Sequence, residues 1–340
     1  MILVTGTYPP QRCGVADYSF RLLESETAKR SNWKLLHVEN TSLINLRKVI
    51  NKLNSIDDIN VNIQYPSINF SRKLLPHFLC LYLRCFTKKK VSVTIHEYTQ
   101  LHWISKLCMF IFFWFAHKLI FTNEFERGAV IKVCSCVENK SRVIKIFSNI
   151  SKSKLEKKIG ERKYDIGYFG YIRHGKGIED FLVVLEQLKK ENKTLKAYIL
   201  GQRLKGLEEF ADSVVLKSKE IGVEVMEGRP DNEVADILSD TKVAFLPYPD
   251  GLSERRGSYL AYIRNLSLVV ATDGKFVTKS QRETFKIVDV DNAAEELKKI
   301  LSLSEDEQNK LQNKVELFAA TEIPSSWDEV VSQYNDYLKI

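Results

Sequence analysis

The sequence has 340 residues, more than a single hydrophobic core usually supports, which favours two domains. Its composition is 44% hydrophobic and 28% charged, with 15 Gly and 8 Pro, which excludes a disordered or collagen-like chain. The six cysteines include no C-x-x-C pair and only six histidines are present, which argues against a zinc site or a disulfide framework and favours a reducing compartment.

No membrane-spanning or cleavable signal segment is expected. The start, MILV, runs directly into a Gly/Pro loop and predicts a first buried strand. The longest apolar run, residues 107–116, is shorter than the roughly 18 residues that span a bilayer. This segment is expected to form a buried or interfacial helix, and the protein to be cytoplasmic.

The net charge of +8 is unevenly distributed. Residues 1–150 hold about 21 Lys and Arg against about 10 Asp and Glu, whereas the remainder is slightly acidic. The first half is therefore expected to face an anionic partner.

In chain order, the first half alternates strand-like and helix-like segments. Strands are expected at MILVTG, WKLLHV, VNIQYP, VSVTIH, KLIFTN and RVIKIF, and helices near residues 17–29, 43–53, 72–85 and 103–117. This alternation predicts right-handed βαβ units in a parallel sheet.

The polar stretch 151–163 lacks an apolar period and is expected to be a linker, after which the pattern begins again. Strands are expected at YDIGYFGY, LKAYILG, VEVME, KVAFLPY, SLVVAT and FKIVDV, and helices near residues 178–190, 207–219 and 232–239 and from residue 256. Three helical segments end the chain, the last near residues 327–338. The fold class is therefore α/β, with two Rossmann-like doubly wound domains and ligands expected in a cleft between them.

Two loops after predicted strands combine glycine with ligand-binding groups. In residues 5–19 (TGTYPPQRCGVADYS), Gly14 opens a helix whose amides can meet an anion or a sugar hydroxyl, although a plain strand-to-helix connection explains it equally. In residues 172–181 (IRHGKGIEDF), Arg173 and Lys176 offer positive charge to a diphosphate. A helix start with solvated basic residues is the alternative.

Two further strand ends carry charged side chains. The segment 248–272 (YPDGLSERRGSYLAYIRNLSLVVAT) places a polar, doubly basic loop before a helix, which suits a pyrophosphate without a metal; a surface patch is the alternative. The segment TIHEY ends a strand with His96 and Glu97, and a lone histidine is more often structural than functional.

Together the loop YPPQRCGVADY, TIHEY, FGYIRHGKGIEDF, ILGQ and DGLSERRGSYLAYIRNLSLVVAT resemble, in this order, the retaining GT-B glycosyltransferases of group 1 (family 4). The resemblance covers nearly the whole chain and implies an N-terminal acceptor domain (1–150), a linker (151–163) and a nucleotide-sugar domain (164–324). It also implies a C-terminal helix (325–340) that crosses back to the first domain.

The resemblance implies roles for individual residues. The catalytic candidates are His96, Lys176 and Arg173. Arg173 is proposed as a substitute for the family's arginine, whose place Tyr171 takes here. The donor-binding candidates are Gly14, Gly201, Ser253, Glu254, Arg256, Gly257 and Ser258.

One departure from the family concerns the two glutamates that it commonly has eight positions apart. The residue eight after Glu254 is Tyr262, and alignment on VVAT instead puts Ser253 and Ala261 at those places. Because the second glutamate usually holds the ribose, ribose recognition must differ here. SERRGS resembles a variant of this loop.

The implied reaction is sugar transfer with retention from a nucleotide sugar to a saccharide or lipid-linked acceptor, in cell-surface polysaccharide or lipopolysaccharide synthesis. No metal or other cofactor is expected, since cationic side chains and helix dipoles take the place of a metal. Alternatives are a GT-B epimerase or phosphorylase and a non-catalytic scaffold that partners an active transferase.

A nucleic-acid partner is not expected, because no RNA- or DNA-binding motif accompanies the basic charge. Arg84 and residues 88–90 (KKK) form a basic cluster near the aromatic helix. They predict peripheral docking on an anionic membrane at its inner face, while most of the aromatic helix is expected to be core.

Overall fold

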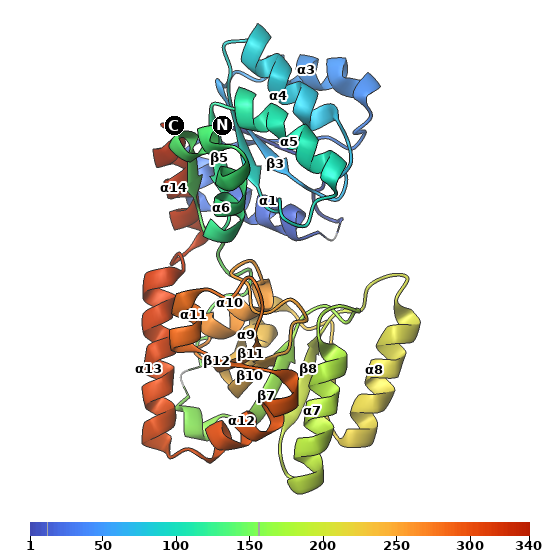
Figure 1. The fold of residues 1–340 in the computed structure, drawn as a ribbon, viewed down its shortest axis with the longest axis vertical. Coiled ribbons are helices and arrows are strands. Elements are labelled where there is room, and N and C mark those ends of the chain that lie inside the picture. The colour runs from blue at the N-terminus through green and yellow to red at the C-terminus, as the bar shows by residue number, and fades with distance from the viewer. Residues whose placement is uncertain (12, 156) are drawn as a thin grey trace. The chain divides into compact units, whose positions relative to one another are not determined.

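The computed structural model describes residues 1–11, 13–155 and 157–340. The chain forms two compact units, one of Met1–Phe147 with Pro324–Ile340 and one of Ser148–Ile323. Each unit is a six-stranded, all-parallel sheet covered by helices (Figure 1). The prediction of two Rossmann-like α/β domains is confirmed.

The sheet of the first unit has the strand order β2-β1-β3-β4-β5-β6. Its strands are β1 (Ile2–Thr5), β2 (Lys34–His37), β3 (Asn60–Tyr65), β4 (Lys90–Ile95), β5 (Lys118–Phe121) and β6 (Ser141–Val143). The central strands are almost completely buried, as expected for a parallel sheet between two helix layers. Strand β1 is largely apolar, whereas β3 and β4 alternate apolar residues with buried polar ones, namely Asn62, Gln64, Ser92 and Thr94.

Two groups of helices cover this sheet. The helices of the first unit are α1 (Gly14–Glu24), α2 (Glu26–Arg30), η1 (Leu43–Asn45), α3 (Leu46–Asn54), α4 (Leu75–Phe86), α5 (Trp103–Phe115), α6 (Glu124–Val133), η2 (Ser135–Lys140) and α14 (Trp327–Leu338). Helices α3, α4 and α5 pack in a row, whereas α14 packs against α1 and α2.

Two predictions for this unit were wrong. The single helix expected over residues 17–29 is divided at Ser25, which has an extended backbone and whose Oγ accepts a hydrogen bond from the Ala28 amide, so that it begins a new helix. Helix α6 was not predicted. Its N-cap is Asn123, whose side-chain oxygen accepts a hydrogen bond from the Glu126 amide, directly after the strand that the apolar pattern identifies.

The sheet of the second unit has the order β12-β11-β10-β7-β8-β9. Its strands are β7 (Tyr164–Phe169), β8 (Ala197–Gly201), β9 (Glu224–Glu227), β10 (Thr241–Leu246), β11 (Leu268–Thr272) and β12 (Lys286–Val288). All six coincide with predicted strands.

Helices α7, α8 and α12 pack together in this unit, and α13 packs against α10 and α11. The helices are η3 (Ile159–Glu161), α7 (Ile178–Glu191), α8 (Glu208–Ile221), α9 (Asp231–Ser239), α10 (Gly257–Arg264), α11 (Lys279–Thr284), α12 (Val290–Ser302) and α13 (Glu305–Glu322). The short helix α11, which Thr278 starts through a capping box with Gln281, was not predicted.

The described part of segment 151–163 is hydrogen-bonded to the second unit. The Ser153 amide donates to Oδ1 of Asn265 over 2.9 Å, and Arg162 donates to the carbonyl oxygens of Thr241 and Leu266. Burial lowers the pKa of Arg162 to about 10, whereas Asp240 opposes this shift. This segment therefore adds polar contacts to the second unit.

Within the described residues, no helix has the length and apolar character needed to cross a membrane. In α5, Met109, Phe112 and Phe113 are fully buried in the core of the first unit, whereas Trp103 and Trp114 are exposed. The aromatic helix is thus only partly core.

Candidate functional site

The second sheet changes direction between its neighbours β7 and β10. From β7 the chain proceeds through β8 to β9, and from β10 it proceeds through β11 to β12. The loops that follow two such strands diverge to opposite faces and leave an opening at the carboxyl ends, where ligands of doubly wound folds bind. The predicted loops 172–181 and 248–258 follow these two strands.

These two loops are in direct contact. A Cβ atom at Gly177, whose φ is +77°, would lie 1.7 Å from the Pro247 carbonyl oxygen, so only glycine permits this approach. The Tyr168 hydroxyl donates to the Lys176 carbonyl oxygen over 3.1 Å and fixes the start of the first loop. The structure therefore brings Lys176 and the doubly basic loop to the same strand ends.

Gly201 serves this packing too. A Cβ atom there would lie 1.9 Å from the Gly170 carbonyl oxygen. The need for glycine at 201 thus has a packing explanation, and its contact with a donor stays a prediction.

Two neighbouring side chains hold Arg256 at this edge. Its guanidinium lies over the Tyr248 ring, 4.0 Å from the centroid, and pairs with the Asp250 carboxylate. The Tyr248 hydroxyl is 2.8 Å from Oγ of Ser258 in the first turn of α10. These contacts orient the guanidinium beside the N-terminus of this helix, where the amides and the macrodipole favour an anion.

The start of α10 is open to a ligand. Gly257 is its first residue, and a Cβ atom there would have no neighbour within 4 Å among the described residues. The other donor candidates of this loop differ in exposure, because Ser253 is buried whereas Glu254 is partly exposed. Arg255 points elsewhere and lies over the Phe276 ring, 5.2 Å from its centroid.

The charges of Arg173 and Arg256 act on a common neighbour. Burial and the nearby Tyr248 raise the pKa of the Tyr168 hydroxyl well above its ordinary value, and the positive charges of Arg256 and Arg173 oppose this shift. Arg173 is exposed and Lys176 partly exposed. Both therefore remain accessible to an anionic ligand.

Neither alignment supplies the family's second glutamate. Ala261 and Tyr262 are both fully buried in α10, and the Tyr262 hydroxyl is 3.1 Å from that of Tyr198 inside the sheet core. The contact of Glu254 with a donor stays a prediction.

In the first unit, the chain changes direction between β1 and β3. Asn69, which follows β3, donates from Nδ2 to the Gly6 carbonyl oxygen over 2.7 Å, and its amide donates to Oγ1 of Thr7. Gly14 is exposed at the first position of α1, and a Cβ atom there would meet nothing within 4 Å among the described residues. No sequence motif marks Asn69.

His96 lies at the carboxyl end of the neighbouring strand β4 and is 9% exposed. Its Nε2 is 2.8 Å from Oε1 of Gln64 on β3. Its ring makes an edge contact with Tyr18 of α1, with the centroids 4.9 Å apart. His96 is thus held from two sides, and Gln64, which supports it, was not identified in the sequence.

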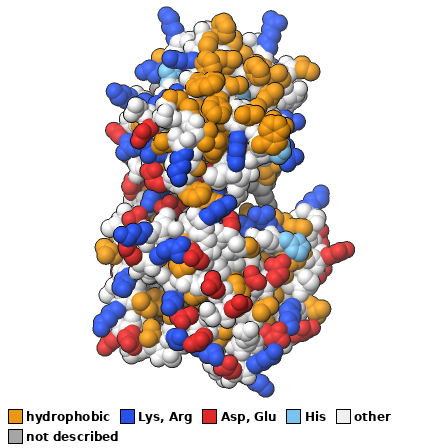
Figure 2. Space-filling view, viewed as in Figure 1, with side chains coloured by type: hydrophobic (Ala, Val, Ile, Leu, Met, Phe, Trp, Pro, Cys, Tyr) orange, Lys and Arg blue, Asp and Glu red, His pale blue; other side chains and the backbone are white. Residues whose placement is uncertain are grey.

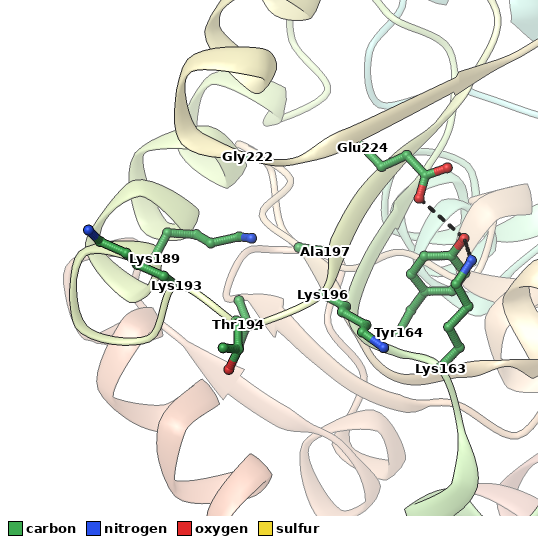
Figure 3. A pocket seen from close by; sticks show the side chains of 10 residues that line it. Lys163, Tyr164, Lys189, Lys193, Thr194, Lys196, Ala197, Gly222 and Glu224 are labelled. Carbon is green, nitrogen blue, oxygen red and sulfur yellow. Dashed lines mark hydrogen bonds between the residues drawn. The ribbon is translucent and has the colours of Figure 1, made fainter.

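A hollow of about 230 Å³ lies elsewhere in the second unit (Figure 3). It adjoins the beginnings of β7, β8 and β9, at Tyr164, Ala197 and Glu224, and so lies at the opposite strand ends from the predicted loops. Four lysines also line it, but in Figure 3 Lys189 and Lys193 extend in opposite directions. These lysines do not form a convergent anion site.

In the part of the chain that the structure describes, no three His, Cys, Asp or Glu side chains form a group able to hold a metal ion.

No protein-family model and no curated protein matches the sequence. Solved structures match over the whole chain. The structure of HepE (Alr3699) from Anabaena in complex with UDP is 13% identical, with a TM-score of 0.71 and 99% of both chains covered.

Two others are similar to a comparable degree. A glycosyltransferase from Rickettsia africae is 12% identical, with a TM-score of 0.69, and covers 99% of this chain and 98% of its own. An E. coli structure bound with UDP-2-fluoro glucose is 11% identical, with a TM-score of 0.67, and covers 100% of this chain and 99% of its own. At this identity the likeness shows the fold, and the protein therefore has the two Rossmann-like domains of the GT-B fold.

Proposed function

We propose that this protein is a glycosyltransferase that takes a sugar from a nucleoside-diphosphate sugar, with a UDP-sugar as the first donor to test. One observation carries the proposal, namely Arg256 held by Tyr248 and Asp250 beside the open N-terminus of α10. A fixed guanidinium next to free helix amides suits a diphosphate. The neighbours of the same fold bound to UDP and UDP-2-fluoro glucose support the choice of nucleotide.

The proposed reaction releases the nucleoside diphosphate as leaving group. Arg256, Lys176 and Arg173 stabilise the negative charge that develops on its phosphate oxygens. In transfer with retention, the departing phosphate oxygen stays on the face that the acceptor hydroxyl attacks and takes its proton. The enzyme then acts by positioning and charge stabilisation, with no side-chain base and no metal required.

In the first unit, we propose that His96 contacts the transferred sugar and that the open start of α1 at Gly14 contacts the donor phosphate and the acceptor. The resemblance to family 4 supports both assignments. For the acceptor we propose a saccharide, lipid-linked, in cell-surface polysaccharide or lipopolysaccharide synthesis. A lipid-linked acceptor would place the enzyme at the inner face of the membrane.

The alternatives differ in what they release. A non-catalytic scaffold would bind a nucleotide without consuming the donor, and an epimerase would convert the sugar while it remains on the nucleotide. At the position of the second glutamate the chain has Ala261 or Tyr262, and both are buried. Their presence favours neither alternative, because the groups that bind the ribose differ from those that transfer the sugar.

A thermal-shift screen of nucleoside diphosphates tests donor binding. A ligand at about 100 times its dissociation constant should stabilise the protein by roughly 2.7 kcal/mol. The diphosphate that stabilises it then identifies the sugar nucleotides for a transfer and hydrolysis assay. If no nucleoside diphosphate shifts the melting temperature and no sugar nucleotide is consumed, the proposal is wrong.

A further inference from the structure

Helices α4 and α5 each expose a stripe of large apolar side chains. On α4 and its N-cap the stripe consists of the exposed Leu74, Phe78 and Phe86 together with the partly buried Tyr82, which are spaced by four and share one helix face. On α5 it consists of Trp103, Ile104, Leu107 and Trp114. We call these eight side chains the α4–α5 surface.

The side chains of the α4–α5 surface are distinct from those with which the two helices pack into the core of the first unit. Other side chains of α4 (Leu75, Leu79 and Leu83) and of α5 (Met109 and Phe112) are buried in that core. Yet Phe86, Trp103 and Trp114 remain 74%, 64% and 61% exposed.

The two helices pack side by side, and hydrophobic side chains gather over this region in Figure 2. Scattered apolar residues are normal on a surface, whereas a contiguous aromatic patch marks an interaction site.

The surroundings of this surface are basic. Helices α3, α4 and α5 contain no Asp or Glu, and residues 43–115 hold 10 Lys and Arg against 3 Asp and Glu. Exposed basic side chains of this region are Arg47, Lys48, Lys52, Arg72, Lys73, Arg84, Lys88 and Lys90. The helices of the second unit mix both charges, as in α7 with Glu179, Asp180 and Lys189.

The structure distinguishes the members of the lysine cluster 88–90. The ammonium group of Lys89 donates to the carbonyl oxygens of Ile56 and Asp58, over 3.2 and 2.6 Å. Lys89 therefore connects two segments of the unit itself. Lys88 and Lys90 are exposed and can meet an external anion.

We propose that the α4–α5 surface docks on a lipid bilayer that contains anionic lipid. Trp103, Trp114 and Phe86 enter the interface, while Lys88, Lys90 and the other exposed basic residues contact the headgroups. A bilayer fits this combination, since aromatic rings favour the interface and basic side chains are attracted to anionic headgroups. Docking would give the enzyme access to a lipid-linked acceptor, and this purpose rests on the proposed function. The docking itself does not depend on it.

Flotation with vesicles tests the proposal on the full chain. Vesicles of phosphatidylcholine alone are compared with vesicles that also contain phosphatidylglycerol, at low and at high salt. Wild-type protein should float with the anionic vesicles at low salt and detach as salt screens the headgroup charge. Lipids brominated in the acyl chain should quench its tryptophan fluorescence.

Two pairs of substitutions divide the surface into its apolar and basic parts. W103S with W114S, and K88E with K90E, should each lower binding to anionic vesicles at least about tenfold, and the first should abolish quenching. The matched controls change exposed residues of the second unit, V183S with L216S and K193E with K196E, and should leave binding unchanged.

Nucleoside-diphosphate thermal shifts of the same variants separate the two proposals. Unchanged shifts show that the fold and donor binding persist, so lost flotation then supports docking even if no transfer is found. Failure of the wild type to float at low salt, or flotation that both surface variants retain, overturns docking but not the proposed function. Concentration-dependent dimers that W103S with W114S dissociates, without vesicle binding, would assign the surface to a second copy and also overturn it.

Discussion

Oε1 of Gln64 accepts a hydrogen bond from Nε2 of His96 over 2.8 Å. The direction of this bond follows from the neighbouring hydrogen bonds of Asn62. Oγ of Ser92 uses its proton to donate to the Val61 carbonyl oxygen, so it must accept from Nδ2 of Asn62. Asn62 therefore turns Oδ1 toward Nε2 of Gln64, 2.6 Å away, and Gln64 turns its oxygen toward His96. Nε2 of His96 thus carries a proton.

Replacing Gln64 by Leu should lower turnover roughly tenfold to a hundredfold, because His96 loses the contact that sets its orientation and tautomer. Nucleoside-diphosphate affinity should not change, since neither Gln64 nor His96 is among the residues proposed to bind the diphosphate. The ¹⁵N chemical shifts of the His96 ring report the tautomer directly. T94V is the matched control, because it removes a hydroxyl from the same network without touching Gln64 or His96; equal losses in both variants would contradict a specific role for Gln64.

Replacing Arg256 or Lys176 by Ala should lower turnover roughly tenfold to a thousandfold while the fold persists, since each removes a preorganised charge partner of the diphosphate. Steady-state kinetics and circular dichroism provide the two readouts. R255A is the control, because Arg255 lies over Phe276 instead of Tyr248, and its effect should be several-fold smaller. Wild-type turnover in R256A and K176A would refute the donor assignment.

The site glycines should divide into two classes. G14A and G257A should keep or slightly raise the melting temperature, because both lie at helix starts with open space, and should weaken nucleoside-diphosphate binding. G177A and G201A should lower the melting temperature, since the new Cβ atoms would lie 1.7 and 1.9 Å from backbone oxygens. Thermal melts and ligand titrations measure both quantities, and unchanged affinity in G14A and G257A would argue against a ligand at these helix starts.

Sugar transfer should persist in excess chelator, because Arg256, Lys176 and the α10 amides supply the positive charge that a cation gives other transferases. The assay compares initial rates with and without EDTA. Complete loss of activity that magnesium or manganese restores would show that the basic loop is not sufficient.

His77 should make the first unit sensitive to mild acid. Burial lowers the pKa of His77 to about 4, while the Lys73 backbone opposes this shift, and the ring stacks on Phe112 with centroids 4.4 Å apart. Because the unfolded chain binds this proton near pH 6.5, stability is fully present above that pH and falls by up to about 3 kcal/mol as pH drops to about 4. H77L should flatten the pH dependence of denaturant unfolding in this window. An unchanged slope would mean that other groups cause it.

The sequence predicted the strands well and the helix boundaries less well. All six strands of the second sheet were found from pattern alone, because the four inner strands are short, largely buried apolar runs and the partly exposed edge strands β9 and β12 keep the alternating pattern. Helix α6 has a mixed face and was missed, and the break at Ser25 depends on a cap that a continuous helical pattern hides.

By itself the sequence determined the two α/β domains and the loops at the strand ends, because alternating apolar periods and glycine-rich connections are local properties. Only the tertiary structure decided which groups meet. Gln64 is hydrogen-bonded to His96, Arg256 lies over the Tyr248 ring and Arg255 lies over the Phe276 ring. The sequence does not show these contacts, because they join residues of different strands and loops. The tertiary structure also turned Lys89 inward and Lys88 outward, a difference that three consecutive lysines cannot show, since side-chain direction follows from packing.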